Sequence, residues 1–181
     1  MNKDYNVTIL GVSGSCFGNY SIYPVESTLY TMIDKNEDIL YKADLIVIEF
    51  GVNDAAAVSL GYVDLLKVYI SINRAVDYIK QISSAKLLFI LAVNPDSIQF
   101  TDYLFKYTTY LNTEYLLNGI NCKLLDLDNA YRSIYVFIKQ NFSLITMDKD
   151  LYNNLDVDNI HPNGEGYKEF AERLTKYINE Y

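Results

Sequence analysis

The sequence predicts a single α/β domain built around a mainly parallel sheet, and three observations lead to this fold class. A chain of 181 residues, 50% hydrophobic and 21% charged, has the length and composition of one globular domain with one core. Four short runs are almost continuously apolar, which is typical of strands covered on both faces. Segments with helical periodicity lie between these runs, and this alternation indicates a parallel sheet. We therefore expect residues 1–181 to form one domain.

The apolar runs are rich in Val, Ile and Leu. The expected strands are Asn6–Leu10, Asp44–Phe50, Lys86–Val93 and Cys122–Leu127. Reactive groups in such sheets gather outside the carboxyl ends of the strands. The first candidates for a site are therefore the segments GVSGSC, GVND and NPDS, which follow the first three runs.

Four helices are expected from the spacing of apolar residues. The clearest covers Val63–Ile82, where a broad apolar stripe recurs at helical spacing. The others are expected at about Thr101–Leu117, at Ala130–Gln140, and after Pro162 and Asn163, where apolar residues from Tyr167 to Ile178 have helical spacing.

Charge and composition exclude several classes of function. The net charge is −8 and no segment is rich in Lys or Arg, so nucleic acid and anionic membranes are not expected partners. The two cysteines, Cys16 and Cys122, and the only histidine have no metal-type spacing, so we expect no metal site. The N-terminal segment MNKDYNVTIL has neither a signal-peptide nor a membrane-anchor pattern, which predicts a cytoplasmic protein.

The turn after the first run contains three potential nucleophiles. Ser13, Ser15 and Cys16 lie within four residues of one another in GVSGSCFGNY. A nucleophile here would need an activating base, because hydroxyl and thiol groups are mostly protonated at pH 7. The alternatives are a Gly/Ser-rich turn without chemistry and, for Cys16, a small buried hydrophobic residue.

His161 is the only imidazole that could act as this base. Asp158 precedes it by three residues, and a tight turn could place its carboxylate on one ring nitrogen while the other nitrogen stays free. Asp156 is a rival carboxylate, and a surface or capping role for His161 is the alternative.

Asn53 is a candidate oxyanion donor. It follows a buried strand in the segment FGVND, where its neutral amide could donate a hydrogen bond to a developing negative charge. The alternative is an asparagine that serves the turn or caps the following AAAV segment.

Together these segments resemble the SGNH (GDSL-type) hydrolases: a Gly-x-Ser turn after an N-terminal strand, GVND after DLIVIEF, and DNIHPN before a last helix. The resemblance spans almost the whole chain. It implies a three-layer α/β/α sandwich of flavodoxin-like type, with no metal and no organic cofactor. It implies Ser13 as the nucleophile, His161 as general base, Asp158 as its orienting carboxylate, and Asn53 with the Ser13 backbone N–H as the oxyanion hole.

The activity implied by the resemblance is a serine esterase that hydrolyses acyl esters. The segment VIEFGVND is similar to family members associated with surface polysaccharides, which implies a small-molecule or carbohydrate ester, such as an O-acetyl group, as substrate. The alternatives are a catalytically impaired binding or assembly module and a sugar O-acyltransferase. The oligomeric state is left open.

Several departures from the family pattern keep those alternatives open. Val12 stands where the family usually has Asp. Between Phe17 and Phe50 the only glycine is Gly18, so the donor that a second glycine loop usually adds to the oxyanion hole is missing or comes from a non-glycine residue. In a competing alignment, NVTILGVSGS is itself that loop and Gly14 is the oxyanion glycine. The GSCFG segment resembles the Gly-Ser-Cys-Phe-Ala signature of a related group, which favours Cys16, whereas a match of GVSGS to the α/β-hydrolase elbow is weaker.

Overall fold

The computed structural model of the chain describes residues 5–22, 27–91, 93–115, 121–146 and 161–180. Three strands and seven helices occur in these ranges. In chain order they are α1 (Leu29–Lys35), α2 (Glu37–Tyr41), β1 (Leu45–Glu49), α3 (Val52–Ser59), α4 (Leu65–Ile82), β2 (Lys86–Leu91), α5 (Phe100–Tyr115), α6 (Leu124–Asn141), β3 (Leu144–Thr146) and α7 (Gly164–Glu180).

The three strands form one parallel sheet in the order β1-β2-β3. The register pairs Glu49 with Ile90 across the first two strands, and Ile90 with Ile145 across the last two. Because successive side chains on a strand point to opposite faces, Phe89 and Ile90 of the central strand face different layers. Both are 1% exposed, so the sheet is covered on both faces at this point.

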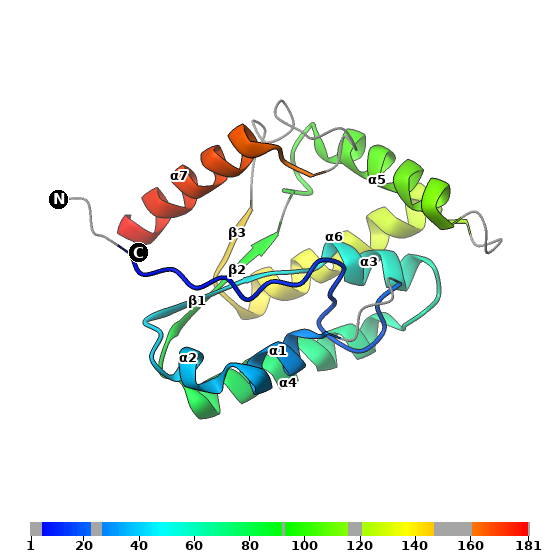
Figure 1. The fold of residues 1–181 in the computed structure, drawn as a ribbon. Helices are drawn as coiled ribbons and strands as arrows, with labels where there is room; N and C mark the ends of the chain where they lie inside the picture. The colour runs from blue at the N-terminus through cyan, green and yellow to red at the C-terminus, as the bar shows by residue number, and fades with distance from the viewer. Residues whose placement is uncertain (1–4, 23–26, 92, 116–120, 147–160, 181) are drawn as a thin grey trace.

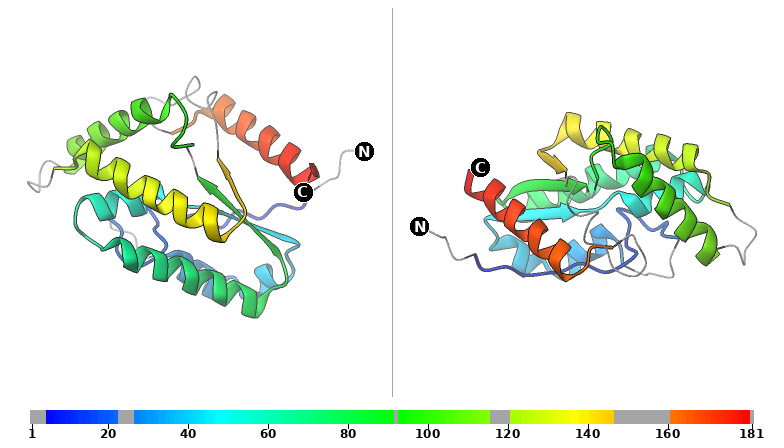
Figure 2. Two further views of the ribbon diagram at one scale, coloured as in Figure 1. Left: turned by 180° about the vertical axis from the view of Figure 1, so that it is seen from behind. Right: turned by 90° about the horizontal axis from the view of Figure 1, so that it is seen from above.

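Helices cover the two faces of the sheet. Ile90 packs against Phe170 and Leu174 of α7, whereas Phe89 belongs to the larger core that includes residues of α3, α4 and α6. Figures 1 and 2 show α7 on one side of the strands, with α4 and α6 on the other. This is the three-layer α/β/α sandwich that the sequence resemblance implies.

A glycine at the end of β1 places the first residues of α3. Gly51 is the residue before α3 and has a φ of 122°, a backbone conformation that glycine adopts readily and other residues rarely. A Cβ atom at this position would lie 2.6 Å from Leu91 Cδ2. The turn therefore leads directly from the strand into the helix, so that Asn53 and Asp54 lie in the first turn of α3.

The expected N-terminal strand, Asn6–Leu10, is wrong. Residues 5–10 form no strand, and Val7 and Ile9 are 73% and 87% exposed. β-branched residues favour a strand only where a neighbouring strand and a covered face stabilise it. This segment has neither among the described residues.

The expected strand Cys122–Leu127 is also wrong, because Leu124 begins helix α6. A short apolar run is ambiguous between strand and helix. Here Leu127 starts a helical pattern of buried residues that continues through Ala130 and Tyr131 to Ile138, while Leu125 is 68% exposed. The third strand is instead β3, whose three residues were not expected from the sequence.

The other expected elements are confirmed. The expected helix Ala130–Gln140 lies within α6, which begins six residues earlier at Leu124. β1 and β2 lie within the expected strands, α4 and α5 start within two residues of the expected helices, and α7 follows Pro162 and Asn163. No helix in the described ranges has the length and apolar character needed to cross a membrane.

Candidate active site

The segment GVSGS forms a β-turn. The backbone N–H of Ser15 donates to the carbonyl of Val12 at 3.3 Å, and Gly14 has a φ of 78°. The turn consists of Val12 to Ser15, and Gly14 is its third residue. A type II turn requires a positive φ at this position, which glycine adopts without steric cost. Ser13 is exposed on this turn, whereas Ser15 is 6% exposed and Cys16 is fully buried.

Asn53 connects this turn to the beginning of α3. Its Nδ2 donates to the Ser15 carbonyl at 3.2 Å, and its Oδ1 accepts a hydrogen bond of 2.9 Å from the Tyr107 hydroxyl of α5. The structure therefore brings two of the segments that the sequence selected, GVSGS and GVND, into direct contact. Sequence reasoning does not single out Tyr107, and its hydrogen bond to Asn53 is what places it at the site.

Asp54 holds the next part of the same loop. Its Oδ1 accepts hydrogen bonds from the Phe17 backbone N–H at 2.9 Å and from the Tyr20 hydroxyl at 2.8 Å. Asp54 is fully buried, and burial raises the pKa of its carboxyl from 3.8 to about 6, although both hydrogen bonds act in the opposite direction. A second contact fixes the turn, because Ser21 Oγ donates to the Gly14 carbonyl at 2.6 Å.

The surroundings of Cys16 disfavour a thiolate nucleophile. Its side chain is 0% exposed, and burial together with the nearby Asp54 carboxyl raises the pKa of the thiol. A reactive cysteine needs the opposite environment, accessible and electropositive. Its backbone carbonyl accepts from the Leu29 N–H at 3.1 Å, so the residue anchors the loop to the start of α1.

Two of the expected catalytic residues, Ser13 and His161, belong to the described part of the chain. Ser13 and His161 are both exposed, and His161 lies three residues before the start of α7. Asp158 and its rival Asp156 lie outside the described residues. In the described ranges, no group of three or more His, Cys, Asp or Glu side chains is placed to hold a metal ion.

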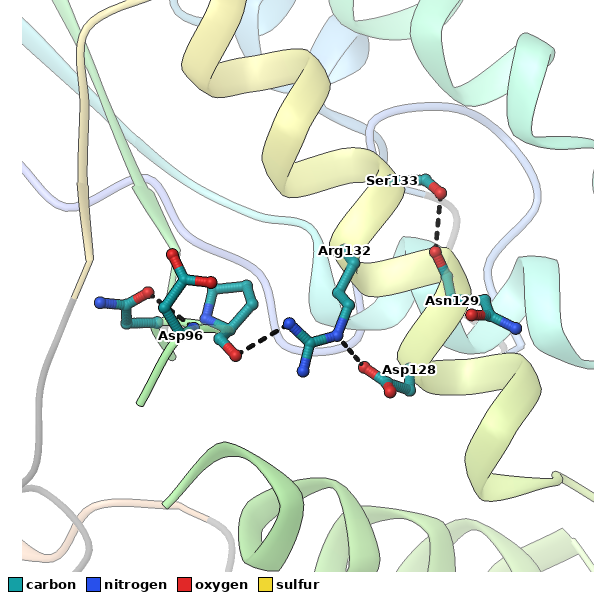
Figure 3. Close-up of polar contacts among 7 residues, drawn as sticks. Asp96, Asp128, Asn129, Arg132 and Ser133 are labelled. Carbon is teal, nitrogen blue, oxygen red and sulfur yellow. Dashed lines mark hydrogen bonds and ion pairs between the residues drawn. The ribbon is translucent and has the colours of Figure 1, made fainter. Parts of the chain in front are cut away.

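The NPDS segment after β2 is held by α6. Arg132 Nη1 donates to the Pro95 carbonyl at 2.9 Å, and Arg132 Nε pairs with Asp128 Oδ1 at 2.6 Å (Figure 3). The side chain of Asn94 accepts from the Asp96 backbone N–H at 3.0 Å, which tightens the turn. These contacts explain NPDS as an anchored loop, and they assign it no chemical role.

Comparison with known protein families tests the resemblance that the sequence motifs indicate. A sequence model described as GDSL-like Lipase/Acylhydrolase matches residues 10–174, which is most of the chain. Comparisons with curated proteins and with solved structures give no significant match. The family match covers the GVSGS turn, GVND and the segment around His161, and the chain belongs to the family of GDSL-like lipases and acylhydrolases.

Proposed function

We propose that the protein hydrolyses acyl esters with Ser13 as nucleophile. The family supports esterase or acylhydrolase activity in general. The observation that supports a nucleophile in this turn is the hydrogen bond from Asn53 Nδ2 to the Ser15 carbonyl. It keeps the amide beside the turn that presents Ser13, where an oxyanion donor is needed.

The proposed chemistry is acyl transfer to serine and then to water. Ser13 Oγ attacks the ester carbonyl while His161 accepts its proton, and Asp158 orients the imidazole ring. The oxyanion is stabilised by the Ser13 backbone N–H and by Asn53 Nδ2, whose second hydrogen has no partner among the described residues. His161 then returns the proton to the leaving alcohol, and water releases the acyl group as a carboxylic acid.

Exposure favours Ser13 over its neighbours. Ser13 is accessible to a substrate, whereas Ser15 and Cys16 are 6% and 0% exposed. Burial also raises the pKa of the Cys16 thiol, which leaves little thiolate at neutral pH. For the alcohol part of the ester we propose a small molecule or a carbohydrate, because the turn lies open on the surface.

The test combines turnover with active-site labelling. 4-Nitrophenyl acetate and acetylated sugars serve as substrates, and a fluorophosphonate probe is followed by mapping of the labelled peptide. We expect turnover and labelling at Ser13, both lost in Ser13→Ala and in His161→Ala. Labelling at Ser15 or Cys16 would refute Ser13 as the nucleophile, and acetyl transfer to a sugar without hydrolysis would indicate an acyltransferase.

A second candidate function, a carbohydrate-binding module without hydrolysis, is favoured by the turn at Gly14. Gly14 has a φ of 78° next to Ser15, whose carbonyl accepts from Asn53, and this turn suits the alignment in which Gly14 is an oxyanion glycine. In that case the turn would hold a donor and no nucleophile. Saturable binding of acetylated sugars by calorimetry, without turnover or labelling, would identify this function.

A further inference from the structure

The orientation of the Asn53 amide is determined by its two partners. The Ser15 carbonyl can only accept a hydrogen bond, so the amide nitrogen must face it. The amide oxygen then faces the Tyr107 hydroxyl, which must donate. The choice between the two amide orientations, which is usually uncertain, is therefore fixed here by chemistry.

Tyr107 itself is held firmly. Its side chain is 2% exposed, and the neighbouring Leu104 and Leu111 of α5 are each 1% exposed. Its ring stacks on Tyr103 and Tyr110, with centroid distances of 6.1 Å and 6.3 Å. A hydroxyl on a buried and stacked ring has little freedom, so it offers Asn53 a donor at a fixed position.

We propose that Tyr107 is a positioning residue that keeps an N–H of Asn53, and not its carbonyl oxygen, directed at the reacting group. This inference rests on the proposed function, because it assigns Asn53 the oxyanion. Because Tyr107 is 2% exposed, it would affect the reaction through Asn53 and not by contact with the substrate.

The physical reason is the asymmetry of the amide group. If the amide rotated by half a turn, its oxygen would face the developing negative charge and repel it. The hydrogen bond from Tyr107 to Oδ1 opposes this rotation, and the Ser15 carbonyl opposes it from the other side. Removal of the Tyr107 hydroxyl leaves a part-buried amide oxygen without this donor, which favours other orientations of the side chain.

The experiment compares Tyr107→Phe with Tyr110→Phe. Both changes remove one hydroxyl from neighbouring turns of α5, but only the first removes a donor to Asn53. With 4-nitrophenyl acetate, we expect kcat to fall by about 10-fold to 100-fold in Tyr107→Phe, with KM within about 2-fold of the wild type. Tyr110→Phe should keep both constants. Equal effects of the two variants, or a change in KM alone, would overturn the proposal.

A double-mutant cycle tests whether Tyr107 acts through Asn53. In an Asn53→Ala background the positioning role has no target, so adding Tyr107→Phe should lower kcat by less than about 2-fold. A further drop as large as in the wild-type background would overturn the proposal, because Tyr107 would then act independently of Asn53.

A measurement without substrate separates this inference from the proposed function. The side-chain amide protons of Asn53 are assigned by NMR from their absence in Asn53→Ala. We expect Tyr107→Phe to increase their exchange with solvent by about 10-fold or more and Tyr110→Phe to leave it unchanged. If the wild type has no esterase activity, the proposed function fails while this result still stands. Unchanged exchange in Tyr107→Phe would overturn the positioning role.

Discussion

The buried carboxyl of Asp54 predicts a specific dependence of stability on pH. Its pKa is about 6 in the folded protein and near 3.8 when the chain is unfolded, because burial disfavours the charged form. The difference of about two units corresponds to about 3 kcal/mol, at about 1.4 kcal/mol per unit. Because the pKa is raised on folding, the folded state binds the proton more tightly than the unfolded state. The contribution of Asp54 to the stability of the protein therefore falls as the pH rises.

Asp54→Asn isolates this contribution. The amide oxygen of asparagine can still accept from the Phe17 N–H and the Tyr20 hydroxyl, but the group carries no charge. Well below pH 4, Asp54 is neutral in both the folded and the unfolded wild type, as the asparagine of the variant is at every pH. Between about pH 4 and pH 6 the wild type loses stability through this group and the variant does not. We expect the free energy of unfolding of the variant, minus that of the wild type, to increase by about 2.4 kcal/mol from pH 4 to pH 7, because part of the total change of about 3 kcal/mol falls below pH 4.

The measurement is urea denaturation followed by circular dichroism across this pH range. A difference that stays constant with pH would refute the reasoning, and a difference that decreases would mean that the folded pKa lies below the unfolded one. Tyr20→Phe provides a second comparison. The Tyr20 hydroxyl donates to the ionised carboxyl and lowers the pKa of Asp54. Its removal should therefore raise that pKa, so that the loss of stability with pH continues to a higher pH than in the wild type.

Two further predictions concern the turn before α3 and the N-terminal segment. Gly51→Ala should lower the free energy of unfolding by about 2–4 kcal/mol, because φ is 122° and the new Cβ would lie 2.6 Å from Leu91 Cδ2. Gly164→Ala, with open space at the start of α7, should change it by less than about 1 kcal/mol, and equal losses would contradict this account. Ile9→Lys should change stability by less than about 0.5 kcal/mol, because the side chain is 87% exposed, whereas Ile48→Ala in β1 should cost about 2–5 kcal/mol. A loss of more than about 1.5 kcal/mol for Ile9→Lys would mean that this side chain is buried, as expected if residues 6–10 form the strand that the sequence predicts.

The sequence correctly predicts the elements with a long periodic pattern and the two strands, β1 and β2, that pair with each other in the sheet. The apolar stripe of α4 runs over 18 residues, which identifies it without tertiary information. Asn6–Leu10 has the composition of a strand, but composition does not tell whether a neighbouring strand is present to pair with it. Cys122–Leu127 is too short to show its period, and the buried residues that identify it as helical lie further along α6.

The candidate site is predicted in part for the same reason. GVND follows β1, so the rule that groups gather at the carboxyl ends of parallel strands holds for this segment. GVSGS follows no strand in the structure, and the contact of Asn53 with the Ser15 carbonyl brings it to the same place. The rule does not identify Tyr107, since a tyrosine among apolar residues of a helix has the pattern of an ordinary core residue. The burial of Cys16 beside Asp54 also depends on packing, so the sequence alone leaves its thiol open as a nucleophile.

The contacts around Asn53 also determine when the site forms during folding. The bond to Ser15 joins residues 38 positions apart, and the bond to Tyr107 joins residues 54 positions apart. Contacts of such separation require large loops to close, and they form after local helices. An intermediate with its helices and sheet in place, but with α5 or the GVSGS turn undocked, would have native-like secondary structure and no oriented amide. Recovery of Asn53-dependent activity during refolding should therefore lag behind recovery of the circular dichroism signal.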